Sequence, residues 1–292
     1  MTQLAEIDRP TVSAPVLNAG QQAASDKLFQ FLLSPDEKEM VISGGPGKGK
    51  TFLMGHIIDD VLPRYKQMCK LMGRPVLYDD AFPTATTNKA AAQLAEASGR
   101  DCSTIHSLLN LVVKEDYSTG KVKLTRGRNW QIHRNKIIII DECSMIDSAL
   151  YKAIHDATFN CKIVYIGDKN QLAPVMELIS PVFKPSIPIV MLTEPVRNAG
   201  QPALVALCSQ LQRVVETGVF EEVHEVPGVI DFLSPAETQA EIDRLFRDPD
   251  HNHKTLAYTN KRVVDYNDYI RHLRGLPDTY VEGETLILGN TV

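Results

Sequence analysis

The chain has 292 residues, 43% of them hydrophobic, which is enough to form one large domain or two ordinary domains with ample core. Its 31 basic and 36 acidic side chains give a net charge of −5, so the overall charge does not indicate a nucleic-acid partner, although a local basic groove would suffice. Five scattered cysteines without a C-x-x-C pair argue against a zinc site or a disulfide framework and favour a reducing compartment, the cytoplasm. We expect neither a signal peptide nor a membrane span, because no apolar run approaches about 18 residues.

Residues 1–16 contain proline and show no sustained periodicity, which predicts a loose leader. The residues that follow predict a helix, because four apolar side chains recur at helical spacing: Ala24, Leu28, Phe31 and Leu32. Gln21 lies near the start of this helix, and its amide could read the edge of an adenine base because it both donates and accepts hydrogen bonds. The local alternative is a solvated glutamine at a helix start.

Residues 41–51, V-I-S-G-G-P-G-K-G-K-T, predict a short apolar strand, a glycine-rich loop and the start of a helix. Residues 44–51 fit G-x-x-x-x-G-K-[ST], the pattern of a phosphate-binding P-loop. In such a loop Lys50 would reach the β and γ phosphates, and the Thr51 hydroxyl would hold Mg²⁺. A chance match in a turn rich in glycine and proline is disfavoured by the strand before the loop and the apolar helix after it. The residues whose backbone N–H groups would turn inward around a triphosphate are Gly45, Gly47, Lys48 and Gly49.

Residues 75–82 predict a second strand, which leads into P-T-A-T-T-N-K-A-A at residues 83–91, a polar turn and an alanine-rich helix start. Threonine hydroxyls and free helix N–H groups at such a junction bind the phosphates of a nucleotide or of a nucleic-acid backbone. Simple N-capping by Thr87 or Asn88 explains the same residues equally well. Further along, His106 lies in S-T-I-H-S-L-L beside an apolar helix face, where a lone histidine is more often structural than functional.

From residue 111 to residue 128 the pattern changes to alternation around S-T-G at residues 118–120. This pattern predicts a β-hairpin with a wet, partly basic face and Tyr117 near its tip. The core of a P-loop fold does not require such a hairpin. It is either a decoration or a means of meeting a second ligand.

Four consecutive isoleucines at residues 137–140 predict a parallel strand that is buried on both faces. Asp141 and Glu142 follow at its carboxyl end, where open α/β sheets place their sites. Asp141 can hold Mg²⁺ through water, and Glu142 can orient and deprotonate an attacking water molecule. The alternative is that the two carboxylates only cap the strand.

Residues 161–166 predict another buried strand, followed by G-D-K-N-Q-L-A-P-V. Its Gln171 amide would lie beside the γ-phosphate, where hydrogen bonding distinguishes a triphosphate from a diphosphate. A further strand at residues 187–192 leads to T-E-P-V-R-N, and Arg197 in this segment is a candidate for stabilising charge in a transition state. Taken alone, such an arginine is more often part of a surface ion pair.

In this order the segments resemble superfamily 1 DNA helicases, specifically the 5′-to-3′ branch that contains RecD and the bacteriophage Dda helicases. The match runs from Gln21 to about Asn267 and includes A-Y-T-N-K at residues 257–261. The resemblance implies an ATP site, with Gln21 at the adenine, made of Lys50, Thr51, Asp141, Glu142, Gln171 and Arg197. It implies a single-strand DNA channel lined by Pro83, Thr84, Asn88, Lys89, His106, Thr259 and Asn260.

The same resemblance implies that the hairpin splits duplex DNA, with Tyr117 as a wedge. The cofactors would be ATP and Mg²⁺. The partners would be single-stranded DNA and duplex junctions, with replication or recombination proteins as further partners, and the chain would act as a monomer in the cytoplasm, the host cytoplasm if a phage encodes it. The rival functions are a P-loop ATPase that acts on protein partners and a fragment that binds nucleotide or DNA without hydrolysis.

We expect an α/β fold, a P-loop NTPase with a RecA-like parallel sheet flanked by helices, an inserted β-hairpin and an incomplete second RecA-like domain. The last domain is expected to be incomplete because the later helicase motifs, similar to T-x-H-x-x-Q-G and V-x-x-T-R, are absent from the 292 residues. The expected boundaries are residues 17–110 and 132–218 for the first RecA-like domain, 111–131 for the hairpin and 219–292 for the second domain. Within the second domain we expect strands at residues 229–232 and 254–258 and helices at residues 236–246 and 262–274.

Overall fold

A computed structural model describes the chain over residues 16–116, 121–174, 177–197, 200–248, 253–282 and 284. The chain divides into two compact units, residues 1–222 and residues 223–292. Within the described ranges no helix is long and apolar enough to cross a membrane.

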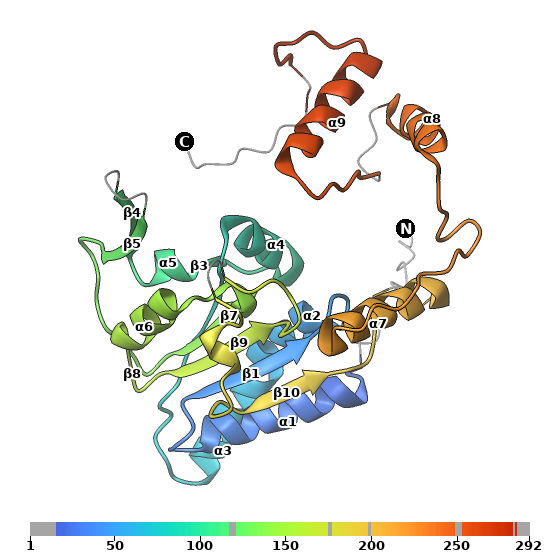
Figure 1. Ribbon diagram of the computed structural model, residues 1–292. Coiled ribbons are helices and arrows are strands. Elements are labelled where there is room, and N and C mark those ends of the chain that lie inside the picture. Colours follow the sequence, from blue (N-terminus) through green and yellow to red (C-terminus); the bar gives the residue numbers. More distant parts are fainter. Residues whose placement is uncertain are drawn as a thin grey trace, which may run out of the picture. The chain divides into compact units, whose positions relative to one another are not determined.

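A six-stranded sheet forms the centre of the first unit (Figure 1), and its strand order is β10-β1-β9-β7-β2-β3. Every neighbouring pair in this sheet is parallel. The strands are β1 (Glu39–Gly44), β2 (Ala81–Ala85), β3 (Ser103–Thr104), β7 (Ile137–Asp141), β9 (Lys162–Gly167) and β10 (Ile189–Leu192). The four isoleucines of β7 are fully buried, which confirms the expectation of a strand covered on both faces.

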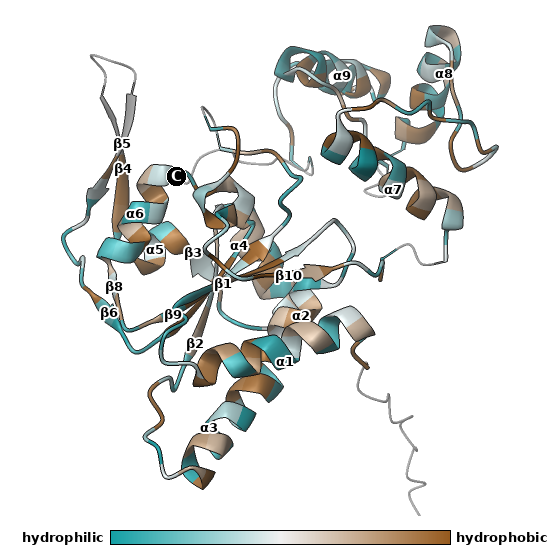
Figure 2. Ribbon diagram, turned by 60° about the horizontal axis from the view of Figure 1, so that its bottom comes forward, coloured by the Kyte–Doolittle hydropathy of each residue, from teal (hydrophilic) through white to brown (hydrophobic). Residues whose placement is uncertain are grey.

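Helices cover both faces of the sheet, and alternate strand residues contact the two sets of helices. Ile137 and Ile139 lie in one core cluster, whereas Ile138 and Ile140 lie in the other. The first cluster includes residues of α1 (Ala19–Leu33), α2 (Lys50–His56), α3 (Leu62–Leu71) and α4 (Asn88–Ser98), with a π-helical turn, Ile57–Val61, between α2 and α3. The second includes residues of α5 (Ile105–Leu108), α6 (Ser148–Asp156) and the short 3-10 helices Cys143–Met145 and Pro181–Phe183. Figure 2 shows apolar and polar residues on the same helices, as expected for elements that pack one face on a core.

The strand expected at residues 75–82 begins later, because β2 spans Ala81–Ala85. Its partner β7 starts at Ile137, which pairs with Ala81, so the residues before Ala81 lie beyond the partner strand. Leu77 is accordingly 45% exposed. Apolar composition alone therefore misplaced this strand by several residues.

The expected hairpin is confirmed as an antiparallel pair of strands, β4 (Leu111–Asp116) and β5 (Lys121–Arg126). Tyr117, the proposed wedge, lies outside the described residues. A second small ladder pairs β6 (His133–Arg134) with β8 (Thr158–Phe159) in parallel. The unit ends with α7 (Pro202–Thr217) and the residues up to Glu222.

The second unit contains the two expected helices, α8 (Pro235–Phe246) and α9 (Asn260–Leu273). The strands expected at residues 229–232 and 254–258 are wrong: the described part of this unit has only an isolated bridge between Val226 and Ile230. A strand needs a partner for its backbone N–H and C=O groups, and no such partner occurs among the described residues of this unit. That residues 219–292 begin a second RecA-like domain stays a prediction.

Candidate active site

Four neighbouring strands end at the same edge of the parallel sheet, and each is followed by one of the polar segments singled out in the sequence. The glycine-rich loop follows β1, and Asp141 with Glu142 ends β7. Gln171 follows β9, and Arg197 follows β10. The fold thus brings to one edge residues that are up to about 150 positions apart in the chain.

The glycine-rich loop needs glycine at two positions for its backbone conformation. Gly47 and Gly49 have positive φ angles of 73° and 76°, which side chains other than glycine rarely adopt. Space is also missing, because a Cβ atom on Gly47 would lie 2.7 Å from the Cβ atom of Arg197. A Cβ atom on Gly49 would overlap the side-chain nitrogen of Gln21. The loop is therefore packed between α1 and the segment that follows β10.

Lys50 is the first residue of α2, directly after Gly49. Its Nζ atom donates to the carbonyl oxygens of Gly44 at 2.8 Å and Gly45 at 3.3 Å. The ammonium group thus lies against the loop, where it can exchange these carbonyls for phosphate oxygens. Thr51 follows on the first turn of the helix and is half-buried.

The two carboxylates after β7 differ in their surroundings. Burial, with a smaller contribution from the charge of Glu142, raises the pKa of Asp141 to about 6, although its carboxylate accepts a hydrogen bond from the Glu142 N–H at 2.9 Å. Glu142 has a φ angle of 54°, a left-handed conformation that is uncommon outside glycine and often occurs at functional sites. Its carbonyl accepts a hydrogen bond from the Thr86 hydroxyl at 3.3 Å.

The oxygen atoms of Thr51 and Asp141 are of the type that Mg²⁺ prefers. A divalent cation would favour the ionised form of Asp141, which burial disfavours, so the residues present fit such an ion. Among the described residues no cluster of three or more His, Cys, Asp or Glu side chains forms a metal site. Mg²⁺ takes one or two carboxylates and completes its shell with water and substrate phosphates.

The segments after β9 and β10 contact the other loops directly. Gln171 accepts a hydrogen bond from the Ser144 hydroxyl at 3.3 Å through its side-chain oxygen, so it lies beside the turn that follows Glu142. The backbone N–H groups of Val196 and Arg197 both donate to the carbonyl of Gly47, at 2.8 and 2.7 Å. Arg197 is therefore anchored to the phosphate loop through its backbone.

Gln21 is 2% exposed, so the alternative of a solvated helix-start residue is wrong. Its side-chain oxygen accepts from the Asn18 N–H at 3.1 Å as part of a capping box, and its side-chain nitrogen donates to the Gly49 carbonyl at 3.4 Å. Its contact with the glycine-rich loop depends on how α1 packs against α2.

The residues proposed to line a DNA channel are more dispersed. Thr84 is 1% exposed and its hydroxyl donates to the Ile139 carbonyl at 2.8 Å, so this hydroxyl is committed to the sheet and is not available to a phosphate. Thr87 caps α4 by accepting from the Ala90 N–H at 3.2 Å, as the capping alternative stated. Asn88 and Lys89 are exposed on the first turn of α4, and half-buried Pro83 precedes them in β2.

Three further candidates, His106, Thr259 and Asn260, lie elsewhere. His106 is on α5, and burial lowers its pKa, so it is neutral at physiological pH. Thr259 caps α9 by accepting from the Arg262 N–H at 3.2 Å, and Asn260 is the first residue of that helix. Thr259 and Asn260 belong to the second unit.

Sequence reasoning missed a group of polar side chains on α7. Lys48 donates from Nζ to the side-chain oxygen of Gln212 at 3.4 Å. Gln212 donates in turn to Glu216 at 3.1 Å, and Asn170 donates to the same carboxylate oxygen at 2.8 Å. The four-residue spacing of Gln212 and Glu216 was visible in the sequence, but nothing in it indicated that this face of α7 meets the loops after β1 and β9.

A glycine-rich loop at the end of β1, carboxylates at the end of β7 and polar segments after β9 and β10 together define a P-loop NTPase. Residues 33–177 match the family described as AAA domain. This match and the relatives described next support a superfamily 1B helicase, the group of RecD- and Dda-like proteins.

Two curated relatives and one solved structure illustrate the similarity. The chain is 31% identical over 153 residues to the RecBCD enzyme subunit RecD of Buchnera aphidicola subsp. Schizaphis graminum, covering 46% of the chain and 23% of that protein. It is 25% identical over 299 residues to the ATP-dependent DNA helicase dda of phage T4, covering 93% of the chain and 61% of that protein. The structure of Bacteroides sp Pif1 in complex with ADP-AlF4 gives a TM-score of 0.48 at 16% identity and covers 87% of the chain and 56% of Pif1. The chain thus spans less than two thirds of each of these proteins.

Proposed function

We propose that the chain is the ATP-hydrolysing part of a DNA helicase that couples ATP hydrolysis to movement on single-stranded DNA and to duplex unwinding. One observation carries the proposal: four adjacent parallel strands deliver a phosphate loop, two carboxylates, a glutamine and an arginine to one edge of the sheet. Similarity to the superfamily 1B helicases supports DNA as the second ligand. ATP and Mg²⁺ are the cofactors.

The residues at this edge divide the chemistry of phosphoryl transfer among them. Lys50 neutralises the β and γ phosphates after leaving the loop carbonyls, and Thr51 with Asp141 would hold Mg²⁺. When bound, Mg²⁺ neutralises charge on the phosphate oxygens. Glu142 orients the attacking water and accepts its proton, and Gln171 hydrogen bonds to the γ phosphate. Arg197 stabilises the charge that develops in the transition state.

The exposed start of α4 is the proposed grip on DNA. Asn88 and Lys89 lie just after the carboxyl end of β2, which is the same edge of the sheet that carries the ATP site. Helix N–H groups and a lysine at this place bind backbone phosphates without reading bases. The grip is therefore expected to weaken as salt concentration rises. His106 and Pro83 are proposed to line the same channel, and the hairpin β4–β5, with Tyr117, to split the duplex.

We also propose that residues 17–110 and 132–218 form the first RecA-like domain, with 111–131 as the inserted hairpin domain. Residues 219–292 would then begin the second domain, in which Thr259 and Asn260 contact DNA. ATP binding would close the two domains on each other and hydrolysis would release them. The chain would act as a cytoplasmic monomer on single strands and duplex junctions, together with replication or recombination proteins.

The test is steady-state ATP hydrolysis with and without single-stranded DNA. We expect DNA to stimulate turnover, and we expect Glu142→Gln to lower turnover by about 100-fold or more, the usual contribution of a general base. Glu96→Gln makes the same change at an exposed position in the second half of α4 and serves as the matched control. Turnover that DNA does not affect would favour a protein-remodelling ATPase. ATP binding without turnover would favour a non-hydrolysing fragment.

A further inference from the structure

The polar face of α7 connects two of the loops at the ATP site. Gln212 contacts Lys48 in the phosphate loop, and Glu216, one turn further on, accepts hydrogen bonds from Gln212 and Asn170. Asn170 is the residue before Gln171. Hydrogen bonds from Asn170 and Gln212 lower the pKa of Glu216, so its carboxylate is ionised at neutral pH. One short chain of side chains therefore joins the loop after β1, the helix α7 and the loop after β9.

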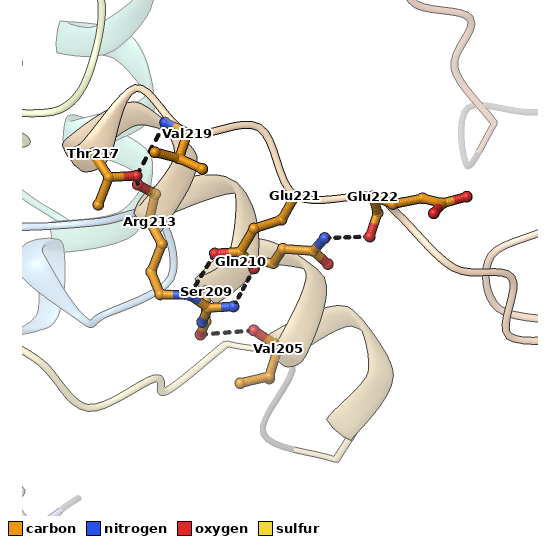
Figure 3. Close-up of polar contacts among 8 residues, drawn as sticks. All are labelled: Val205, Ser209, Gln210, Arg213, Thr217, Val219, Glu221 and Glu222. Atoms are coloured by element: carbon orange, nitrogen blue, oxygen red, sulfur yellow. Dashed lines mark hydrogen bonds and ion pairs between the residues drawn. The ribbon is translucent and has the colours of Figure 1, made fainter.

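The same helix also holds the residues that lead out of the first unit (Figure 3). Arg213 forms a two-pronged ion pair with Glu221, at 3.0 and 2.7 Å, and Gln210 donates to the Glu222 carbonyl at 2.6 Å. The chain turns back at Gly218, whose φ angle is 69°, and the Val219 N–H donates to the Thr217 hydroxyl at 3.2 Å. Glu222 is the last residue of the first unit. These contacts thus hold residues 219–222 against α7.

Among these hydrogen-bonded side chains, Lys48 is the residue for which a bound triphosphate would compete with Gln212. It is a cation within a loop whose other groups bind phosphate, yet its partner is the neutral amide of Gln212. An ammonium group is attracted more strongly to a phosphate oxygen, which carries negative charge, than to an amide oxygen, which carries only a partial charge. A triphosphate in the loop would therefore draw Lys48 away from Gln212 and leave the Gln212–Glu216 pair joined to the ATP site through Asn170 alone.

We infer that α7 couples the ATP site to the connection between the two units, with Gln212 and Glu216 as positioning residues. In one state Gln212 holds Lys48, and residues 219–222 are clamped on α7. In the other state Lys48 binds the triphosphate, and α7 keeps its hydrogen bond to Asn170 but loses the one to Lys48. The contacts that hold residues 219–222 on α7 then loosen. The inference rests on the proposed function, because it takes a nucleoside triphosphate as the ligand. A ligand can shift such an equilibrium because its affinity for the two states differs.

The first experiment changes how tightly α7 holds Lys48 and measures the dissociation constant of a fluorescent, non-hydrolysable ATP analogue. Gln212→Glu replaces a neutral partner by an anion and is expected to weaken the binding of the analogue about threefold, as for an exposed ion pair. Gln212→Ala frees Lys48 and is expected to strengthen binding by about twofold. Gln239→Glu introduces the same charge on α8, where Gln239 likewise pairs with an acidic residue four positions later, and leaves binding unchanged.

Gln212→Glu could also weaken binding because its new carboxylate repels the phosphates directly. Lys48→Met distinguishes this repulsion from an effect that passes through Lys48. If Gln212 acts through Lys48, the effects of both Gln212 substitutions disappear in the Lys48→Met background. If they persist there unchanged, the substitutions act directly on the ligand and the inference is overturned. Circular dichroism of each variant checks that the helices remain folded, which is expected because Gln212 is only half-buried.

The second experiment reads out the far end of α7 by hydrogen exchange. With the ATP analogue bound, the amides of Gly218 and Val219 are expected to exchange about threefold faster, because they donate to the Val214 carbonyl and the Thr217 hydroxyl at the point where residues 219–222 leave α7. The change is expected to be absent in Lys48→Met. Binding of the analogue without faster exchange would overturn this inference and leave the proposed function standing. Absence of any binding would overturn both.

Discussion

The two units differ most in how they bury apolar side chains. In the first unit, residues from both faces of the sheet are fully buried, among them Phe31 and Tyr165. In the described part of the second unit, α9 buries no residue and α8 buries one, Ile242, while Leu256 and Tyr258 are 91% and 104% exposed. Burial contributes roughly 25 cal/mol per Å² of apolar surface. The first unit is thus stabilised by long-range packing, and the helices of the second depend more on local signals.

A matched pair of phenylalanines tests this difference directly. Phe31 on α1 is 0% exposed, and Phe232 in the second unit is 58% exposed. We expect Phe31→Ala to lower the free energy of unfolding by about 3–5 kcal/mol, because it leaves a cavity in a packed core. We expect Phe232→Ala to lower it by about 0.5 kcal/mol or less.

Urea denaturation of the full chain provides the measurement, followed by circular dichroism, which reports on the helices of both units, and by fluorescence of Trp130, the single tryptophan of the sequence. Trp130 packs against the second core cluster of the first unit, so its emission reports on that unit. Equal effects of the two substitutions would contradict the difference in packing. They would mean that the Phe232 side chain is packed against other residues of the chain.

The sequence predicted those elements whose signal is local. The isoleucines of β7, the glycine-rich loop and the helices α8 and α9 were expected within one or two residues of their observed limits. The strand at Ala81–Ala85 was misplaced, because its start is determined by the start of β7. The two strands expected in the second unit failed for a related reason: a strand depends on a partner that its own residues do not specify.

The candidate site shows the same division between local and long-range information. The P-loop pattern located Lys50 and Thr51, and the rule that parallel sheets place sites at carboxyl ends located Asp141. The burial of Gln21 and the contact of Lys48 with Gln212 could not be predicted, because they arise where separate helices meet the loop. Lys48 and Gln212 are 164 residues apart in the chain.

A second prediction concerns a buried cation in the first unit. Lys162 is 0% exposed, and its Nζ atom donates to the carbonyls of Phe31, Ser34 and Glu37 at 2.7, 2.6 and 2.5 Å. Lys162→Met keeps the volume but leaves buried carbonyls without donors, which costs about 1–3 kcal/mol for each group that water cannot reach. We expect a loss of about 3 kcal/mol in the free energy of unfolding. Lys38→Met, at a lysine near the surface, is the matched control and is expected to stay within about 0.5 kcal/mol of the wild type.

The pH profile of unfolding extends this prediction. Burial lowers the pKa of Lys162 to about 8 in the folded chain, compared with about 10.4 in an unfolded one. Between these two values the unfolded state binds more protons, so this lysine makes the free energy of unfolding rise as pH increases through that window. Lys162→Met lacks this contribution, and the difference between the two profiles is expected to grow from about pH 8 to about pH 10. Parallel profiles would show that the three carbonyls hold the ammonium group at its ordinary pKa.

The smallest expected effect lies in the second unit and tests whether local signals support its helices. Ser234 and Glu237 form a capping box at the start of α8: the serine side chain accepts from the Glu237 N–H at 3.4 Å, and the Glu237 carboxylate accepts from the Ser234 N–H at 2.8 Å. Ser234→Ala removes one of these bonds and is expected to destabilise α8 by about 1 kcal/mol, which corresponds to about fivefold faster hydrogen exchange along the helix. Ser209→Ala on α7, where the serine only donates to the Val205 carbonyl within its own helix, is the control (Figure 3). Because few long-range contacts oppose the opening of α8, the full free-energy loss from the missing cap should appear in its exchange rates. Unchanged exchange would show that tertiary packing also stabilises this helix.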